Sequence, residues 1–441
     1  MRQRTGITSS KALRDTARPR RHERPAWWPS AVTSVALLVT HTAIATDFVI
    51  DQPTFIDTNW TISAADTVTI LNDGINTHGE LTIRNGRVIN QGTLTNHGAI
   101  KIRSGQTLVN HGLVDNYGNV VIDSGHLENA GELIFHPPGY VLISGDRALT
   151  NSGTIDNDSA IRLTYGTIVN DGSMDSSLFL NIDYDGQFSG SGQFNLSNDS
   201  LSISYGGQMS VPALVVNADA DRFVEIRVTE PASLLDAGTL FRFESNQPLD
   251  DFAFHNIYLG PGAQLLADEI FVDRFARLHG DSATAVGHVT VAGEFQVGDS
   301  TYYTGGFDVA GDLDILETAT VRIGLSGADD GEFTVLDVEN VLNLDGTLDV
   351  SLLHGYTPAP GDVFTILLAQ AITGAFDTIQ FPDIAGLHFD FTTTATSGIL
   401  AVTAEPVPIP PSLALLGSAM WPVSRLARGR HRGSRCQVHM A

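Results

Sequence analysis

The sequence predicts an all-β protein whose body is a right-handed parallel β-helix, a solenoid of coils about 20 residues long. The main observation is a short unit that occurs five times between Leu81 and Met174. Each unit contains a glycine, and these glycines are spaced 19, 20, 20 and 21 residues apart. An Asn-x-Gly triplet follows each one. A fixed period near twenty residues is typical of stacked solenoids. The glycines are Gly86, Gly105, Gly125, Gly145 and Gly166, and the triplets begin at Asn90, Asn110, Asn129, Asn151 and Asn170.

The apolar residues of each unit fall at matching places. Two lie three and five residues before the glycine, one follows the glycine, and one follows the triplet. A spacing of two is that of a strand with one buried face, so each unit should hold three short strands. An antiparallel meander with Asn-Gly hairpins is the alternative, but the in-phase triplets favour coils that pair strand by strand. The three buried columns should be Ile83, Ile102, Ile122, Leu142 and Leu163; Val88, Leu108, Leu127, Leu149 and Ile168; and Leu94, Val114, Leu133, Ile155 and Met174.

The turn residues have a predicted role as well. Glycine supplies positive φ at the corners, and asparagine tolerates that region better than most residues. Asparagines at equivalent corners of successive coils can also stack in a hydrogen-bonded ladder.

The regular period fades after about residue 180. We divide the chain into a signal segment (1–45), a β-helix (46–290, most regular at 81–174), a β-rich closing part (291–405) and a tail (406–441). In the least regular part, 213–285, we expect longer loops or one short helix near Ala263–Asp273. A single stack over 46–400 would hold about eighteen turns and rise roughly 85 Å, at about 4.8 Å per coil.

The charge of the chain is unevenly placed. The first 45 residues and the last 31 together hold 13 of the 25 basic residues but only 2 of the 50 acidic ones. Residues 46–410 therefore carry 12 basic and 48 acidic residues, a net charge of about −36. So acidic a body repels nucleic acid and anionic lipid, and we expect neither as a partner. Cys436 is the only cysteine, so the body holds no disulfide framework.

The N-terminus has the layout of a secretory signal peptide. Four arginines between Arg18 and Arg24 precede an apolar stretch, Ala31–Thr40, which is too short to span a membrane. Ala43 and Ala45 then fit the small-x-small cleavage rule, which would make Thr46 the first residue of the exported protein.

The C-terminus has three parts: a Pro-rich motif, an apolar segment and an arginine cluster. Val407, Pro408, Ile409 and Pro410 form the motif, Pro411–Val423 is the apolar segment, and the cluster includes Arg425, Arg428 and Arg430. This layout resembles the PEP-CTERM sorting signal of Gram-negative exported proteins. Ile409 stands where the commonest form has glutamate. The resemblance implies transient anchoring in the inner membrane, processing by an exosortase-type protease, and a link to exopolysaccharide and biofilm.

A second resemblance lies upstream. The runs Leu344–Val350 and Gly361–Leu367, followed by Ile372–Phe376, look like the closing segment of autotransporter-like and PEP-CTERM β-helix proteins. The residues after Glu405 are too few for a transmembrane barrel, so the resemblance implies a passenger-like body without its own pore.

No motif in the chain specifies a chemical reaction. A polysaccharide lyase would need a basic residue, but the four in the repeat region do not all occupy one phase of the repeat; they are Lys101, Arg103, Arg147 and Arg162. A glycosidase would need two carboxylates, and with 48 acids such pairs carry no specificity. The histidines of the first coils are typical of surface turns rather than of a metal site; they are His78, His97, His111 and His126. We therefore expect no catalytic residues, metal or cofactor.

The function these observations favour is structural. We expect an exported bacterial protein of the cell surface or extracellular matrix, an adhesin or matrix rod associated with exopolysaccharide or biofilm. The alternative is a carbohydrate-active β-helix enzyme, a polysaccharide lyase or hydrolase.

Overall fold

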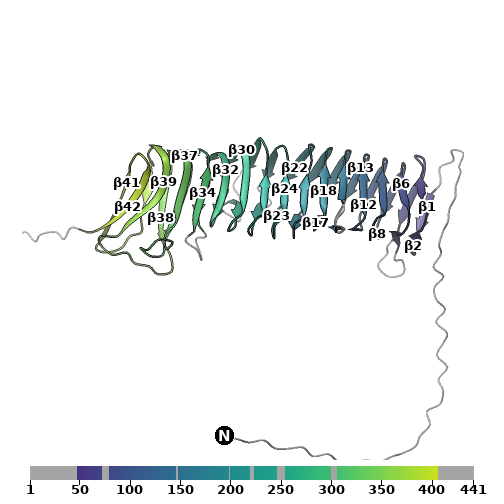
Figure 1. Cartoon of the computed structure of the whole chain (residues 1–441), viewed down its shortest axis with the longest axis horizontal. Helices are drawn as coiled ribbons and strands as arrows, with labels where there is room; N and C mark the ends of the chain where they lie inside the picture. The colour runs from purple at the N-terminus through teal and green to yellow at the C-terminus, as the bar shows by residue number, and fades with distance from the viewer. Residues whose placement is uncertain are drawn as a thin grey trace, which may run out of the picture.

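The computed structural model describes residues 47–71, 79–145, 148–197, 199–218, 223–245, 254–298 and 305–405. These residues form forty-two β-strands and no helix. The strands stack as coils along one long axis, and the molecule is a rod with its first coil at one end and β41 and β42 at the other (Figure 1). Within the described ranges no helix has the length and apolar character needed to cross a membrane.

Each regular coil has three strands and therefore three faces. The strands of face 1 pair in parallel from coil to coil over the whole rod, for example β8 with β11 and β11 with β14. Face 1 consists of β2 (Pro53–Ile56), β5 (Glu80–Ile83), β8 (Ala99–Ile102), β11 (Asn119–Asp123), β14 (Tyr140–Ser144), β17 (Ala160–Thr164), β20 (Leu180–Asp183), β23 (Leu201–Ile203), β26 (Glu225–Val228), β29 (His255–Leu259), β31 (Ala276–Gly280), β33 (Glu294–Val297), β36 (Thr320–Leu325), β38 (Thr347–Leu352) and β40 (Thr378–Gln380).

Faces 2 and 3 are built in the same way from the other two strands of each coil. Face 2 consists of β3 (Trp60–Ile62), β6 (Arg87–Asn90), β9 (Thr107–Asn110), β12 (His126–Asn129), β15 (Ala148–Asn151), β18 (Thr167–Asn170), β21 (Gln187–Ser189), β24 (Gln208–Ser210) and β27 (Leu234–Asp236). Face 3 consists of β1 (Asp47–Ile50), β4 (Thr67–Ile70), β7 (Thr93–Asn96), β10 (Leu113–Asn116), β13 (Glu132–Phe135), β16 (Thr154–Asn157), β19 (Ser173–Ser176), β22 (Gln193–Ser197), β25 (Leu214–Ala218) and β28 (Leu240–Ser245). The predicted parallel β-helix is confirmed.

The buried columns are those predicted except in the coil of Gly145, where Leu142 and Tyr140, three and five residues before that glycine, both lie on the outer side. Ile122 is fully buried and pairs with Ile102 on one side and with Ile143, not Leu142, on the other. Leu142 pairs with Arg162 and faces outward, so its assignment to the core is wrong. The turn before Gly145 is one residue shorter than in the other coils, and a shift of one residue moves a side chain to the opposite face of a strand.

The asparagines of the repeat form the predicted ladder. In the first four, the side-chain Nδ2 donates to the Oδ1 of the asparagine in the next coil, at 2.7–2.8 Å, and all five side chains are buried. Each Nδ2 also donates to a backbone oxygen of the next coil, as Asn129 does to Thr154 at 3.0 Å. A second, shorter ladder joins Asn96 to Asn116 at the corner between faces 3 and 1, where Phe135 interrupts it. The ladder runs from Asn90 through Asn110, Asn129 and Asn151 to Asn170.

The triplet glycines have a different role from the one predicted. Their φ angles are not positive, and the asparagines are the last residues of strands. The glycines are needed because the coils touch at this corner: a Cβ on Gly131 would lie 2.2 Å from the backbone oxygen of Gly112. The positive-φ prediction holds for Gly86, Gly105 and Gly145, whereas the preceding residue takes that conformation in the coils of Gly125 and Gly166.

Replacing Gly131 with alanine should therefore be costly. The new methyl group would force backbone apart across the stack, and we expect a loss of about 3 kcal/mol in the free energy of unfolding. Gly105→Ala is the matched control, since its φ is +75° but a Cβ there meets no atom within 4 Å; it should cost only about 1 kcal/mol. Urea titrations of both variants measure the difference. An equal loss in the two would show that conformation, not close approach, selects the glycines.

The second half of the rod has longer coils. Gln208 pairs with Leu234, 26 residues on, and Glu225 pairs with Asn256, 31 residues on. Face 1 therefore has fifteen strands, fewer than the eighteen turns expected, and the stack rises about 67 Å. The helix expected near Ala263–Asp273 is also wrong, because β30 (Gln264–Val272) occupies that segment.

Long strands replace the corner between faces 2 and 3 in this half. The first part of β30 pairs with β27 and its last part with β28, so one strand bends around the core. The remaining strands of faces 2 and 3 are β32 (Ala283–Val291), β34 (Gly306–Ala310), β35 (Leu313–Ile315), β37 (Val335–Leu344) and β39 (Val363–Gly374).

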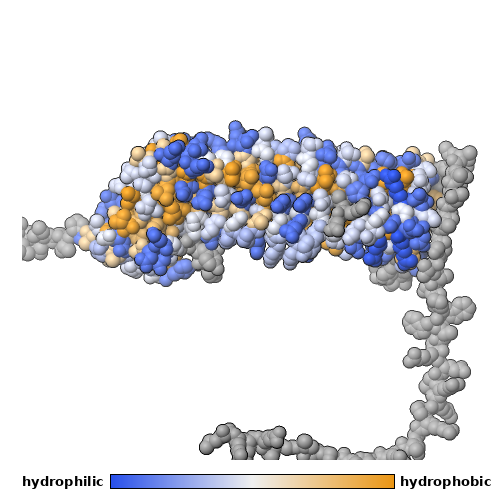
Figure 2. All heavy atoms as spheres, viewed as in Figure 1, coloured by the Kyte–Doolittle hydropathy of each residue, from blue (hydrophilic) through white to orange (hydrophobic). Residues whose placement is uncertain are grey.

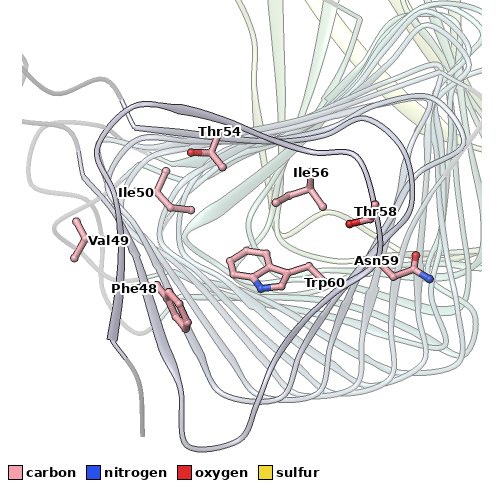
Figure 3. Close-up of a pocket in the computed structure, with 8 residues that line it drawn as sticks. All are labelled: Phe48, Val49, Ile50, Thr54, Ile56, Thr58, Asn59 and Trp60. Carbon is pink, nitrogen blue, oxygen red and sulfur yellow. The ribbon is translucent and has the colours of Figure 1, made fainter. Parts of the chain in front are cut away.

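The two ends of the rod differ. At the C-terminal end, β42 (Ser397–Ala404) pairs antiparallel with β39, and β41 (Leu387–Thr393) pairs antiparallel with β42. These strands close the core over Phe364 and Leu400. At the other end the first coil is hollow, and Figure 3 shows Ile50, Ile56 and Trp60 pointing into its interior while Val49 points away.

Candidate functional site

The sequence-predicted signal residues lie outside the described part of the chain. This applies to Ala43 and Ala45 of the cleavage site, to Val407, Pro408, Ile409 and Pro410 of the tail motif, and to Arg425, Arg428 and Arg430. His78 also lies outside the described residues. These interpretations stay predictions, and the site must be sought on the rod itself.

The rod distributes its positive charges unevenly among the faces. Seven of the ten lysines and arginines in the described part of the body lie on face 1 or at its edge. Four of them occupy one row on the outer side of face 1, three or four coils apart: Lys101, Arg162, Arg227 and Arg322. Face 1 is therefore the least acidic surface of a very acidic body. The seven residues are Arg84, Lys101, Arg103, Arg162, Arg227, Arg277 and Arg322.

Most of these cations are engaged in ion pairs between neighbouring strands. Lys101 Nζ lies 2.7 Å from a Glu80 oxygen, and Arg162 Nη2 lies 2.8 Å from Asp183 Oδ2. Nearer the C-terminal end, the buried Glu294 carboxylate lies between Arg277 and Arg322, with Nε–O distances of 2.5 and 3.2 Å. Exposed pairs add little stability, but the buried Glu294 carboxylate would be an uncompensated charge without its two arginines.

Aromatic and amide groups lie in the same row of face 1. The Tyr258 ring has the Arg227 guanidinium 5.1 Å from its centre on one side and the His279 ring 4.9 Å away on the other. Asn181 follows Arg162 in this row, and its buried Oδ1 has no hydrogen-bond partner among the described residues. Figure 2 shows one side of the rod, where hydrophobic residues form an interrupted band among hydrophilic ones.

Three tyrosines stand at the corner where face 1 ends and face 2 begins. Tyr165, Tyr184 and Tyr205 follow β17, β20 and β23, and they are 58%, 38% and 52% exposed. The ring centres lie 5.5 and 4.9 Å apart, and the second pair is nearly parallel, with 5° between the rings. The result is a tyrosine stack that runs along the axis of the rod. In the sequence, the stack is indicated by a tyrosine directly before a Gly-containing turn in three successive coils. Our sequence analysis missed this pattern.

The backbone of the tyrosine stack is unusual. All three tyrosines have left-handed φ angles, 56°, 50° and 52°, which cost roughly 1–2 kcal/mol each for a residue other than glycine. Ring stacking returns about 0.5–1.5 kcal/mol per pair. In earlier coils the left-handed position at this corner is occupied by Gly105, Ser124 or Gly145. Stability alone therefore does not explain why three successive coils carry tyrosine here.

The histidines of the first coils fall into two separate groups, one at a corner of the rod and one on face 2. His97, Tyr117 and His136 stack at the corner between faces 3 and 1, with ring centres 4.9 and 4.2 Å apart. His111 and His126 line a shallow hollow on face 2 together with Glu128. In the described ranges no group of three His, Cys, Asp or Glu side chains converges as metal ligands would.

Two pairs of aspartates face each other on adjacent coils. Asp308 pairs with Asp337 across face 2, and burial together with the Asp337 charge raises the pKa of Asp308. Asp156 pairs with Asp175 across face 3, where burial and then the Asp158 and Asp175 charges raise the pKa of Asp156. These are the carboxylate pairs that the sequence left unspecified, and they lie on different faces from the basic row.

Fold and surface define the class of this protein: it is a long parallel β-solenoid that carries an ion-paired face and a tyrosine-bearing corner. Searches of protein-family models and of curated proteins found no match to this chain.

Proposed function

We propose that this chain is an exported structural protein or adhesin of a bacterial surface or extracellular matrix, associated with exopolysaccharide. The observation that carries the proposal is the unbroken rod of stacked coils, held by apolar columns and asparagine ladders without a cysteine in its body. Such a rod offers long, regular faces to a polymer or a neighbouring cell. Its acidity favours solubility and disfavours nucleic acid.

The proposed localisation rests on the sequence at the two ends of the chain. The secretory layout of residues 1–45 directs export, with cleavage after Ala45. The tail from Val407, which resembles the PEP-CTERM signal, begins just after the closing strand β42. The thirteen apolar residues Pro411–Val423 would reach about 20 Å as a helix, short of the roughly 30 Å hydrocarbon core. They would serve as a temporary anchor, with the arginines on the cytoplasmic side, until an exosortase-type protease removes the tail.

Mass spectrometry of the exported protein tests the proposed export and processing. We expect a mature form that begins near Thr46 and lacks the residues after about Pro410. A variant with Arg425, Arg428 and Arg430 replaced by glutamine should fold normally but accumulate in a different fraction of the cell, because the positive-inside signal is weakened. An exported protein that still ends at Ala441 would contradict the sorting proposal, and a protein retained in the cytoplasm would contradict export.

A further inference from the structure

Among the residues that the structure describes, the tyrosine stack is the most exposed aromatic cluster. Tyr165, Tyr184 and Tyr205 each leave more than a third of their surface in solvent. The neighbouring coil ahead of Tyr165 has Gly145 at the same corner. The stack thus presents a row of ring edges and three phenol groups, one per coil.

Polar groups hold the stack in place. Directly before Tyr184, the buried Asp183 accepts hydrogen bonds from Arg162 at 2.8 and 3.1 Å and from the Thr164 hydroxyl at 2.6 Å. These bonds tie β20 to β17 at the point where both strands enter the tyrosine corner. The rings therefore project from a rigid element rather than from a loose loop, which is what a preorganised binding surface requires.

We propose that the tyrosine stack binds an uncharged polysaccharide chain that lies along the rod axis. A sugar ring has an apolar C–H surface that packs on aromatic groups, and its hydroxyls pair with phenol groups and amides. Tyrosine suits such contacts because it joins a large apolar body to a polar tip.

Charge selects among the candidate partners. The body carries a net charge of about −36, and Asp185 lies next to Tyr184 in the same turn. A second copy of this chain and an anionic polymer are both repelled by such a surface, whereas an uncharged polymer is not. The inference rests on the proposed extracellular function, because it requires a polymer outside the cell.

Native gel electrophoresis with polymer in the gel tests the proposal on the full chain. The probes are hydroxyethyl cellulose, dextran and galactomannan as uncharged polymers, and alginate as the anionic one. The test variant carries Tyr165→Ser, Tyr184→Ser and Tyr205→Ser together, since Ser124 already occupies this corner with a φ of 53°. Tyr140→Ser is the control: Tyr140 is 44% exposed on β14, away from the stack.

We expect at least one uncharged polymer to retard the unmodified protein and the Tyr140 variant, and alginate to retard neither. The triple serine variant should bind about tenfold more weakly or worse, because it loses every ring of the stack. Its melting temperature should stay within a few degrees of the original, because Ser124 already occupies this corner with a left-handed φ and only ring stacking of about 0.5–1.5 kcal/mol per pair is lost. The single change Tyr184→Ser, with the middle ring removed, should give an intermediate affinity.

Three outcomes would overturn the proposal: no retardation by any uncharged polymer, unchanged binding by the triple variant, or equal retardation by alginate. The proposal would also be overturned if the triple variant and Tyr184→Ser both bound more weakly and also melted well below the unmodified protein. The role of the stack would then be structural. None of these outcomes bears on the export and processing measured by mass spectrometry. Failure of the binding site is therefore distinguishable from failure of the proposed function.

Discussion

Replacing Ile122 with aspartate is expected to lower the free energy of unfolding by about 4–6 kcal/mol, enough to unfold many domains. Ile122 is fully buried in the first column, between Ile102 and Ile143 of the adjacent coils. A carboxylate there loses its hydration and finds no partner within the apolar interior. The loss should appear in urea titrations followed by circular dichroism.

The neighbouring residue provides the matched control for this experiment. Val121 lies on the same strand but on the outer side, beside Lys101 of the preceding coil. Val121→Asp introduces the same charge one residue away, near a positive partner, and should change stability by less than about 1 kcal/mol. If the two variants were equally stable, the assignment of inner and outer sides on face 1 would be wrong.

The asparagine ladder should be almost as sensitive. Asn129→Leu preserves the approximate side-chain volume but removes the central rung between Asn110 and Asn151. The Asn110 Nδ2 group loses this acceptor, and the Thr154 backbone oxygen loses the side-chain donor of Asn129. Each weakened or unsatisfied buried group costs about 1–3 kcal/mol, so we expect a total loss of about 3–5 kcal/mol.

A matched change outside the ladder separates burial from amide chemistry. Asn195→Leu on face 3 also removes an amide that bonds a neighbouring coil, the preceding one, to Asp175 at 2.6 Å, but this bond is exposed to water. This change should lower the free energy of unfolding by less than about 1 kcal/mol. Urea titrations of both asparagine variants measure the difference. Similar losses in both variants would mean that the buried ladder contributes no more than a surface hydrogen bond.

The repeat region was predictable because one pattern recurs in five coils and each coil constrains the others. Val88 and Leu94 of the first unit, with their equivalents in later units, lie in the columns assigned from sequence. The asparagine ladder followed from the same periodicity. Prediction failed at Leu142, where Val141, Leu142 and Ile143 are all apolar and the pattern of one coil cannot tell inside from outside. Only the register with Ile122 and Leu163 decides it.

By itself, the sequence determined that the chain is a parallel solenoid with a strongly acidic body, since short-range periodicity and composition suffice for both. The tertiary structure alone decided which side chains meet across coils. It brought Arg277, Glu294 and Arg322 together and aligned Tyr165, Tyr184 and Tyr205 at one corner. Arg277, Glu294 and Arg322 are 17 and 28 positions apart, because coils in the second half of the rod vary in length, so sequence spacing does not reveal their register. Hydrogen bonding between neighbouring strands fixes that register, and with it the surface that the rod presents.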